Sequence, residues 1–241
     1  IRKHASVNTS QVNPFRFEEY MEPALQAGDD ILYVGMSSGI SGSFASAKMA
    51  IEQLKAKYPE RDLRAVDTLS ASLAEGIVVL KAVEYVNAGM DIDEIERKLN
   101  ELSYSMCQIF MVDDLMHLRR TGRLSNAVAL AGSVLQIKPL LKGDPEGKIV
   151  CFAQVRGRKK SIELMAEQYD RYVEHAECET IGIAHGDCPE DAEALITLLN
   201  RNHPPKNIIN ACYEPMTGAH VGPGALALFF YGKKEFRQAT K

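Results

Sequence analysis

A short apolar segment, Ile31–Met36, runs directly into a loop of serine and glycine, and this order of residues constrains the fold most. The segment reads ILYVGM and has no polar alternation, which is typical of a β-strand covered on both faces. The loop SSGISGS covers residues 37–43, and apolar residues at helical spacing follow it: Phe44, Ala47, Ile51 and Leu54. A buried strand that passes through a tight turn into a helix predicts an α/β fold with a parallel sheet.

The same alternation continues along the first half of the chain. Asn13 and Pro14 predict the start of a helix that Pro23 breaks or kinks and that Gly28 ends. Further strands are expected over residues 63–66 and 106–112, and further helices over residues 70–88 and 92–102, the second of these opened by Asp91 and Glu94. This order predicts a first α/β domain over residues 1–114, in which helices flank a parallel sheet.

The second half predicts a mixed sheet. The turn 144–147 (DPEG) lies between two apolar segments, Ile137–Leu141 and Lys148–Val155, which predicts an antiparallel pair of strands. Helices are expected over residues 161–175 and 189–200, and strands over residues 179–184, 207–212 and 225–231. Hairpins combined with crossover helices predict a second α/β domain with a mixed sheet over residues 115–241.

Composition excludes several classes of function. The chain has 241 residues, of which 46% are hydrophobic and 25% charged, as is typical of soluble globular proteins. Its 28 Lys and Arg against 32 Asp and Glu leave a net charge of −4, so no basic excess is present to bind nucleic-acid phosphates. The longest apolar run, Ala225–Tyr231, is far shorter than the ~20 residues that cross a bilayer. We expect neither a nucleic-acid partner nor an integral membrane segment.

Five cysteines are scattered along the chain without a CxxC pair, which is typical of buried thiols in a reducing compartment. We therefore expect a cytoplasmic protein. No metal-ligand spacing and neither of the glycine-rich nucleotide motifs GxxxxGK[ST] and GxGxxG occurs, so we expect no metal and no cofactor. The chain opens at Ile1 rather than at methionine, and we expect its numbering to begin inside a longer protein.

The loop SSGISGS is a candidate anion site. Backbone N–H groups are unpaired where a helix begins, and its dipole favours an anion there. Ser37, Ser38, Ser41 and Ser43 add hydroxyl donors, and glycines let a ligand approach the backbone. The same residues also suit a tight turn that binds nothing. A carboxylate or phosphate site and a plain turn therefore both remain open at this point.

The same segment supports a second hypothesis, a serine hydrolase. Residues 35–39 (GMSSG) fit the G-x-S-x-G elbow that presents a nucleophile, which would be Ser37. The base would be His185 or His220 and the acid Asp187 or Asp113. The elbow normally follows several strands of a large sheet, whereas one clear strand precedes it here. We therefore keep the hydrolase as the alternative.

Two further residues are candidates for the same anion. His220 lies in residues 216–224 (MTGAHVGPG), whose glycines and proline predict an ordered loop that holds one imidazole between two strands. Arg156 ends a predicted strand in VRGRKK, where a guanidinium could bind a carboxylate or phosphate with two hydrogen bonds. The segment HLRRTGRLS contains four more basic residues: His117, Arg119, Arg120 and Arg123. We expect some of them to be functional and most to lie at the surface, but the sequence does not show which.

Taken together, these segments resemble the DegV family of bacterial fatty-acid-binding proteins. The matching pieces, in family order, are TSQ (9–11), SSGISGS (37–43), LRRTGRLS (118–125), IKP (137–139), VRGRK (155–159) and GAHVGPG (218–224). Three departures stand out. Ser43 replaces a usual threonine, Ala219 and Val221 replace threonines beside the histidine, and the family's N-terminal strand is absent from this sequence.

The resemblance implies two α/β domains with one long-chain fatty acid between them. Its tail would lie in an apolar tunnel, and its carboxylate would lie near the domain junction. The ligand-binding residues that this implies are Thr9, Ser10, Ser37, Ser38, Gly39, Arg156 and His220. In such systems a separate kinase phosphorylates the bound acid for phospholipid metabolism, so we expect a carrier rather than an enzyme. A small-anion sensor that carries no lipid remains a third reading.

Overall fold

Two sheets of different size organise the chain. The computed structural model describes residues 7–124 and 137–238, so Ser125, the last residue of LRRTGRLS, lies outside the described residues. The smaller sheet pairs β1 (Ile31–Gly35) with β2 (Leu63–Asp67) in parallel. The larger sheet has six strands in the order β5-β4-β3-β8-β6-β7. These are β3 (Met106–Met111), β4 (Ile137–Gly143), β5 (Ile149–Arg156), β6 (Thr180–His185), β7 (Asn207–Cys212) and β8 (Leu226–Tyr231).

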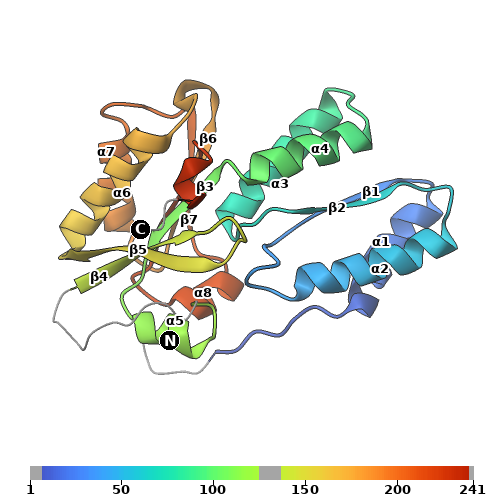
Figure 1. Ribbon diagram of the computed structural model, residues 1–241, viewed down its shortest axis with the longest axis horizontal. Coiled ribbons are helices and arrows are strands. Elements are labelled where there is room, and N and C mark those ends of the chain that lie inside the picture. The colour runs from blue at the N-terminus through green and yellow to red at the C-terminus, as the bar shows by residue number, and fades with distance from the viewer. Residues whose placement is uncertain (1–6, 125–136, 239–241) are drawn as a thin grey trace.

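Helices cover both faces of the small sheet, as the uninterrupted apolar run of β1 predicts. Ile31 and Tyr33 pack against the cluster formed by α1 (Pro14–Gln26) and α2 (Ser43–Lys57). Leu32 and Val34 point the other way, toward the core that includes α3 (Leu73–Asn87) and α4 (Ile92–Ser103). Figure 1 shows β1 and β2 between these two pairs of helices.

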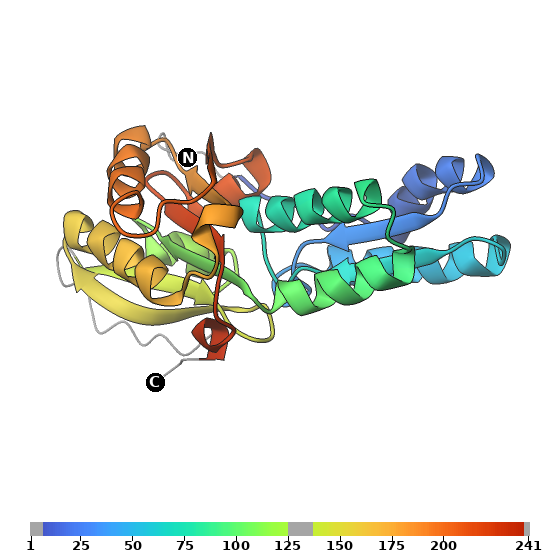
Figure 2. The ribbon, with the colours of Figure 1, turned by 90° about the horizontal axis from the view of Figure 1, so that it is seen from above.

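One helix, α3, contacts both sheets. It packs on β1 of the small sheet and on β3, β6 and β8 of the large one (Figure 2). Gly182 of β6 permits this close approach, because a Cβ there would lie 3.0 Å from Leu73 Cβ. On the opposite face of the large sheet, α6 (Arg158–Tyr172) and α7 (Pro189–Leu199) bury a second core. The smaller elements are α5 (Leu115–Arg120), η1 (Ala176–Cys178), α8 (Pro215–Val221) and α9 (Glu235–Gln238).

The position of β3 differs from the sequence expectation. We expected it to be a third strand of the parallel sheet, but it pairs antiparallel with β4 and β8 in the large sheet. Every residue of β3 is buried, and a continuously apolar segment suits either sheet. Its partners lie later in the chain, so no local pattern identifies them. The change of sheet therefore falls before Met106, and the division into residues 1–114 and 115–241 stays a prediction about domains.

Three local signals at the ends of elements are confirmed, and two other expectations are not. Asn13 caps α1 by accepting a hydrogen bond from the Arg16 backbone N–H at 3.0 Å, and Asp91 caps α4 in the same way. The turn 144–147 joins β4 to β5 as expected. Pro23 does not end α1, which continues to Gln26. Residues 216–224 were expected to form a loop, but most of them belong to α8, which Pro215 opens and Gly222, at φ 77°, ends.

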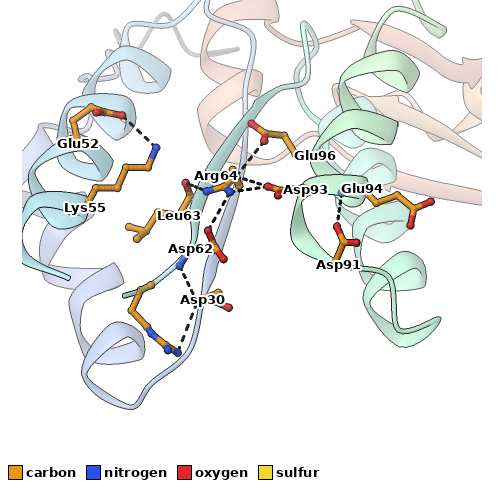
Figure 3. Close-up of polar contacts among 11 residues, drawn as sticks. Asp30, Glu52, Lys55, Asp62, Leu63, Arg64, Asp91, Asp93, Glu94 and Glu96 are labelled. Carbon is orange, nitrogen blue, oxygen red and sulfur yellow. Dashed lines mark hydrogen bonds and ion pairs between the residues drawn. The ribbon is translucent and has the colours of Figure 1, made fainter. Parts of the chain in front are cut away.

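A charged cluster at the surface joins β2 to α4 (Figure 3). Arg64 of β2 reaches Asp93 at 2.6 Å and Glu96 at 3.4 Å on α4, and Asp62 at 3.0 Å beside it. Ion pairs with exposed partners each contribute little, about 1 kcal/mol or less. The cluster therefore orients α4 on the small sheet, while the apolar core supplies most of the stability. Within the described ranges, no helix has both the length and the apolar character needed to span a membrane.

A buried arginine connects the two sheets at their junction. Arg237 is 1% exposed. Its guanidinium donates to the carbonyls of Met106 at 3.0 Å, Asp144 at 2.8 Å and Leu69 at 2.7 Å, and to Ser70 Oγ at 3.2 Å. One side chain thus joins the start of β3, the β4–β5 turn and the loop after β2. Burial lowers the pKa of Arg237, but the four acceptors satisfy its charge.

We expect Arg237→Met to lower the free energy of unfolding by about 3 kcal/mol or more, because it leaves buried carbonyls without a donor. Urea unfolding followed by circular dichroism measures this. Arg97→Met is the matched control, since Arg97 is exposed and pairs with Glu101 on the same helix. Its effect is expected to stay within about 0.5 kcal/mol. Equal losses for the two variants would contradict the role given to Arg237.

Candidate ligand-binding site

A cavity of about 400 Å³ lies between the small sheet and the large one. This volume is within the usual range of small-molecule sites, roughly 300–1,000 Å³. Its lining comes from the segment before α1, the loop after β1, the start of α3, strands β3 and β8, and α8. The apolar part of the lining includes Val12, Phe17, Tyr33, Met36, Ile40, Phe110, Ile149, Val221 and Phe229. Most of this wall therefore suits a hydrocarbon.

A hydrogen bond between distant parts of the chain marks the polar part of the wall. Thr9 Oγ1 and His220 Nε2 lie 2.8 Å apart, and both residues line the cavity. His220 lies in the last turn of α8, one turn after Thr217, which lines the cavity too. The sequence placed His220 in an ordered loop. The structure places it on a short helix instead, which also fixes the direction of the imidazole.

The first three residues of SSGISGS lie outside this lining. Ser37 is fully buried, and its hydroxyl donates to the Gly147 carbonyl at 2.8 Å while accepting from the Gly39 N–H at 3.1 Å. Ser38 is exposed, and its N–H faces the Asp67 carboxylate at 3.3 Å. At Gly39 a Cβ would lie 2.5 Å from the Glu146 carbonyl oxygen. In this arrangement Ser37 and Gly39 contact the β4–β5 turn and Ser38 contacts the end of β2, and the direct binding roles of all three residues stay predictions.

The later serines of the same loop, together with Ser10, are part of the cavity wall. Ser41 and Ser43 both line it, and the Ser43 N–H donates to Ser41 Oγ at 3.2 Å. Gln11 fixes the loop by donating to the Gly42 carbonyl at 3.0 Å and to Ser46 Oγ at 2.7 Å. The sequence showed that this loop offers hydroxyls but not which of them face inward, because that depends on the contact with the β4–β5 turn.

The structure places the candidate arginines Arg156 and Arg123 differently relative to the cavity. Arg156 is exposed at the end of β5 and does not line the cavity. Arg123 does line it, and among the described lining residues it is the sole arginine or lysine. Its guanidinium donates to the Thr121 carbonyl at 2.5 Å, which holds its side chain close to its own turn. The motif HLRRTGRLS contained this residue, but nothing in the pattern distinguished Arg123 from its neighbours.

A half-buried carboxyl group adds an unexpected polar element. Glu75, the third residue of α3, lines the cavity. Burial raises the pKa of Glu75 to about 7, the negative charge of Glu214 adds to this, and a hydrogen bond from the Met36 N–H opposes it. Burial also raises the pKa of Tyr33 to about 12, with help from the charges of Glu75 and Asp67. Glu75 does not stand out in the sequence, since one glutamate in the first turn of a helix is common.

The described side chains do not assemble the hydrolase alternative or a metal site. The Ser37 hydroxyl is bonded to a carbonyl, while His220 pairs with Thr9 and His185 Nδ1 accepts from the Cys188 N–H. A triad needs the serine bonded to an imidazole. Over residues 7–124 and 137–238, no group of three or more His, Cys, Asp or Glu is placed to hold a metal ion. The arrangement suits an amphiphile with an apolar body and one polar end.

Comparison with known proteins agrees with this geometry. A family model described as "Uncharacterised protein, DegV family" matches residues 1–233. A DegV domain-containing protein of Clostridium perfringens is 40% identical over 232 residues, which are 96% of this chain and 80% of that protein. The chain belongs to the DegV family.

Solved DegV structures share the fold. The Bacillus subtilis DegV structure, described as a fatty acid binding protein, is 32% identical with a TM-score of 0.79 and covers 94% of this chain and 79% of its own. A Thermus thermophilus DegV-family structure, described by its fatty acid binding, is 28% identical with a TM-score of 0.86 and covers 96% of this chain and 81% of its own. The expected fold class, a small parallel sheet and a larger mixed sheet flanked by helices, is confirmed.

In this DegV-family chain, Ser37→Ala tests the structural role of the loop. We expect it to lower the free energy of unfolding by about 1–3 kcal/mol, because the buried Gly147 carbonyl loses its donor. Chemical denaturation measures the loss. Ser38→Ala, the adjacent exposed serine, is the matched control and is expected to change stability by about 0.5 kcal/mol or less. A Ser37→Ala protein as stable as the control would show that the contact contributes nothing.

Proposed function

We propose that this chain binds one long-chain fatty acid in the cavity, with the carboxylate at the Thr9–His220 end. The observation that carries the proposal is one continuous cavity that combines a long apolar wall with hydroxyl and imidazole groups. The DegV relatives described as fatty acid binding proteins support it, because they share the fold around the same junction. The chain then acts as a carrier rather than as a catalyst.

The acyl tail and the carboxylate contribute differently to the free energy of binding. Burying ~14 methylenes at ~0.8 kcal/mol each contributes at most ~11 kcal/mol before the costs of association. Each hydrogen bond to a charged carboxylate contributes roughly 1.5–3 kcal/mol. The tail therefore sets most of the affinity, and the polar groups set the orientation.

Thr9, Ser10, Ser41 and His220 are the carboxylate donors we propose, all of them lining the cavity. Arg123 supplies positive charge on the same wall. Ser37, Ser38 and Gly39, which the family resemblance put beside the carboxylate, would act in this arrangement by holding the loop in place. Arg156 would need a different conformation of the β5 end to reach the ligand.

The first prediction concerns the lipid that the purified protein carries. Mass spectrometry of an organic extract of the purified protein should find a near-stoichiometric long-chain fatty acid. Ala71→Phe places a ring in the cavity wall and should remove most of that lipid. Ala45→Phe, on the exposed side of α2, is the control and should retain it. A clean extract, together with no binding of added fatty acid, would contradict the proposal.

The same purified protein can be used to test the serine-hydrolase alternative. A fluorophosphonate probe reacts with an activated serine, and Ser37 is buried with its hydroxyl bonded to a carbonyl. We expect no covalent adduct by intact mass spectrometry. Labelling at Ser37 would replace the carrier with a serine hydrolase.

We further propose that a separate kinase acts on the bound acid. The kinase would transfer the γ-phosphoryl group of ATP to a carboxylate oxygen, which releases ADP and leaves an acyl phosphate. Thr9 is followed by Ser10, an exposed residue of the same cavity wall, so a carboxylate held at Thr9 and His220 would lie near the surface. This placement would allow a partner protein to reach it.

His220→Gln is expected to keep bound lipid and to lose most phosphorylation by a bacterial fatty-acid kinase. The tail still fills the cavity, while the carboxylate loses one positioning group. His203→Gln is the matched control, because His203 is exposed and does not line the cavity. Thin-layer separation of radiolabelled acyl phosphate measures turnover. Unchanged turnover in His220→Gln would refute this role.

A further inference from the structure

Glu75 is an unusual residue to find in a wall meant for hydrocarbon. It lies half-buried in the first turn of α3, and the lining of the same cavity includes Met36, Phe110 and Phe229. Among the described residues Glu75 has no ion-pair partner, and its hydrogen bond comes from the Met36 backbone N–H. A carboxylate in such a place depends on cavity water for most of its solvation.

The nearby charges do not replace that water. Glu214, just before α8, carries a negative charge toward Glu75 and is itself held by hydroxyls, those of Ser72 at 2.8 Å and of Thr217. The other titratable or charged groups that face this region are Tyr33 of β1, Asp67 at the end of β2, Tyr213 after β7, His220 of α8, and Arg123. The two influences on Glu75 that oppose its ionisation, burial and Glu214, outweigh the single donor.

We propose that Glu75 couples cargo binding to a proton: an acyl chain fills the cavity beside Glu75 only when this carboxyl group is neutral. The inference rests on the proposed function, since it concerns the same cavity. An entering chain displaces the water that solvates an ionised Glu75, and methylenes offer no replacement. A neutral carboxyl group keeps its bond with the Met36 N–H and tolerates the hydrocarbon.

The direction of the pH effect follows from linkage. In the empty protein the pKa of Glu75 is about 7, and a bound chain raises this pKa further because it adds to the burial. Affinity is therefore complete well below pH 7, begins to fall near pH 7, and continues to fall toward the pKa of the loaded state. Over that range the proton uptake per bound ligand rises from about one half at pH 7 toward one. Glu75 would thus make the carrier load at lower pH and release at higher pH.

The test compares wild-type protein with Glu75→Gln and uses cis-parinaric acid, a fluorescent long-chain fatty acid, as the probe. Between pH 7 and pH 8 we expect the wild-type Kd to rise about fivefold through Glu75. Glu75→Gln keeps the shape and cannot ionise, so it should lose this component and bind more tightly than wild type at pH 8. Glu84→Gln, on the exposed side of the same helix, should behave as wild type.

The ligand's own carboxyl group is present in both titrations, so the difference between the pH profiles of wild type and Glu75→Gln belongs to Glu75. Isothermal calorimetry of the wild-type protein in two buffers of different ionisation enthalpy counts the protons taken up, even if Glu75→Gln fails to fold. Identical profiles for wild type and Glu75→Gln, or binding without proton uptake near pH 7.5, would overturn the inference and leave fatty-acid binding intact. Failure of both proteins to bind at any pH would instead refute the proposed function.

Discussion

The cavity depends on a buried contact between loops that belong to different sheets. The Ser37 hydroxyl, in the loop after β1, donates to the Gly147 carbonyl in the β4–β5 turn. Gly147 tolerates little change, because a Cβ there would lie 2.1 Å from Ser37 Oγ. Arg237 stabilises the same junction by donating hydrogen bonds to the carbonyls of Leu69 and Asp144. With these loops fixed, Ser41 and Ser43 face inward and the wall between the two sheets is complete.

The same contact explains why the wall has two kinds of surface. Strands β3 and β8 supply Phe110 and Phe229, whose position follows from pairing within the large sheet. The polar groups come from segments at the edge of that sheet, the residues before α1 and the helix α8. An amphiphile fits such a wall in one orientation. Glu75 is the exception to this arrangement, and its environment gives it a protonation state that depends on the cavity's contents.

Most local elements were predictable from the sequence, because their signals are local. Asn13, Asp91 and the turn 144–147 have direct physical effects on the backbone of their neighbours, and the structure confirms each one. The pairing of β3 could not be predicted, since an apolar strand carries no information about its direction or partner. Residues 216–224 were read as a loop because of their glycines, although Pro215 is a good first residue for a helix.

The candidate site was predictable in part, for a related reason. Thr9, Ser10 and His220 were expected in the site and lie in the wall of the cavity. Which serines of SSGISGS face inward depends on a contact with a turn about a hundred residues later, and no local pattern shows that contact. Glu75 was overlooked because a single charge in a helical turn is usually at the surface, and Arg123 was named in HLRRTGRLS without a signal that separated it from its neighbours. Their importance arises from burial, which only the assembled fold determines.

The central claim is that the cavity holds one acyl chain whose carboxylate lies at Thr9 and His220. An NMR titration with palmitic acid labelled with ¹³C at its carboxyl carbon tests this most directly. The claim requires a single bound resonance, saturating near one ligand per chain, that shifts in Thr9→Val and in His220→Gln but stays in place in Ser38→Ala. A bound resonance whose chemical shift is unchanged in both cavity variants, or several resonances without saturation, would contradict the claim.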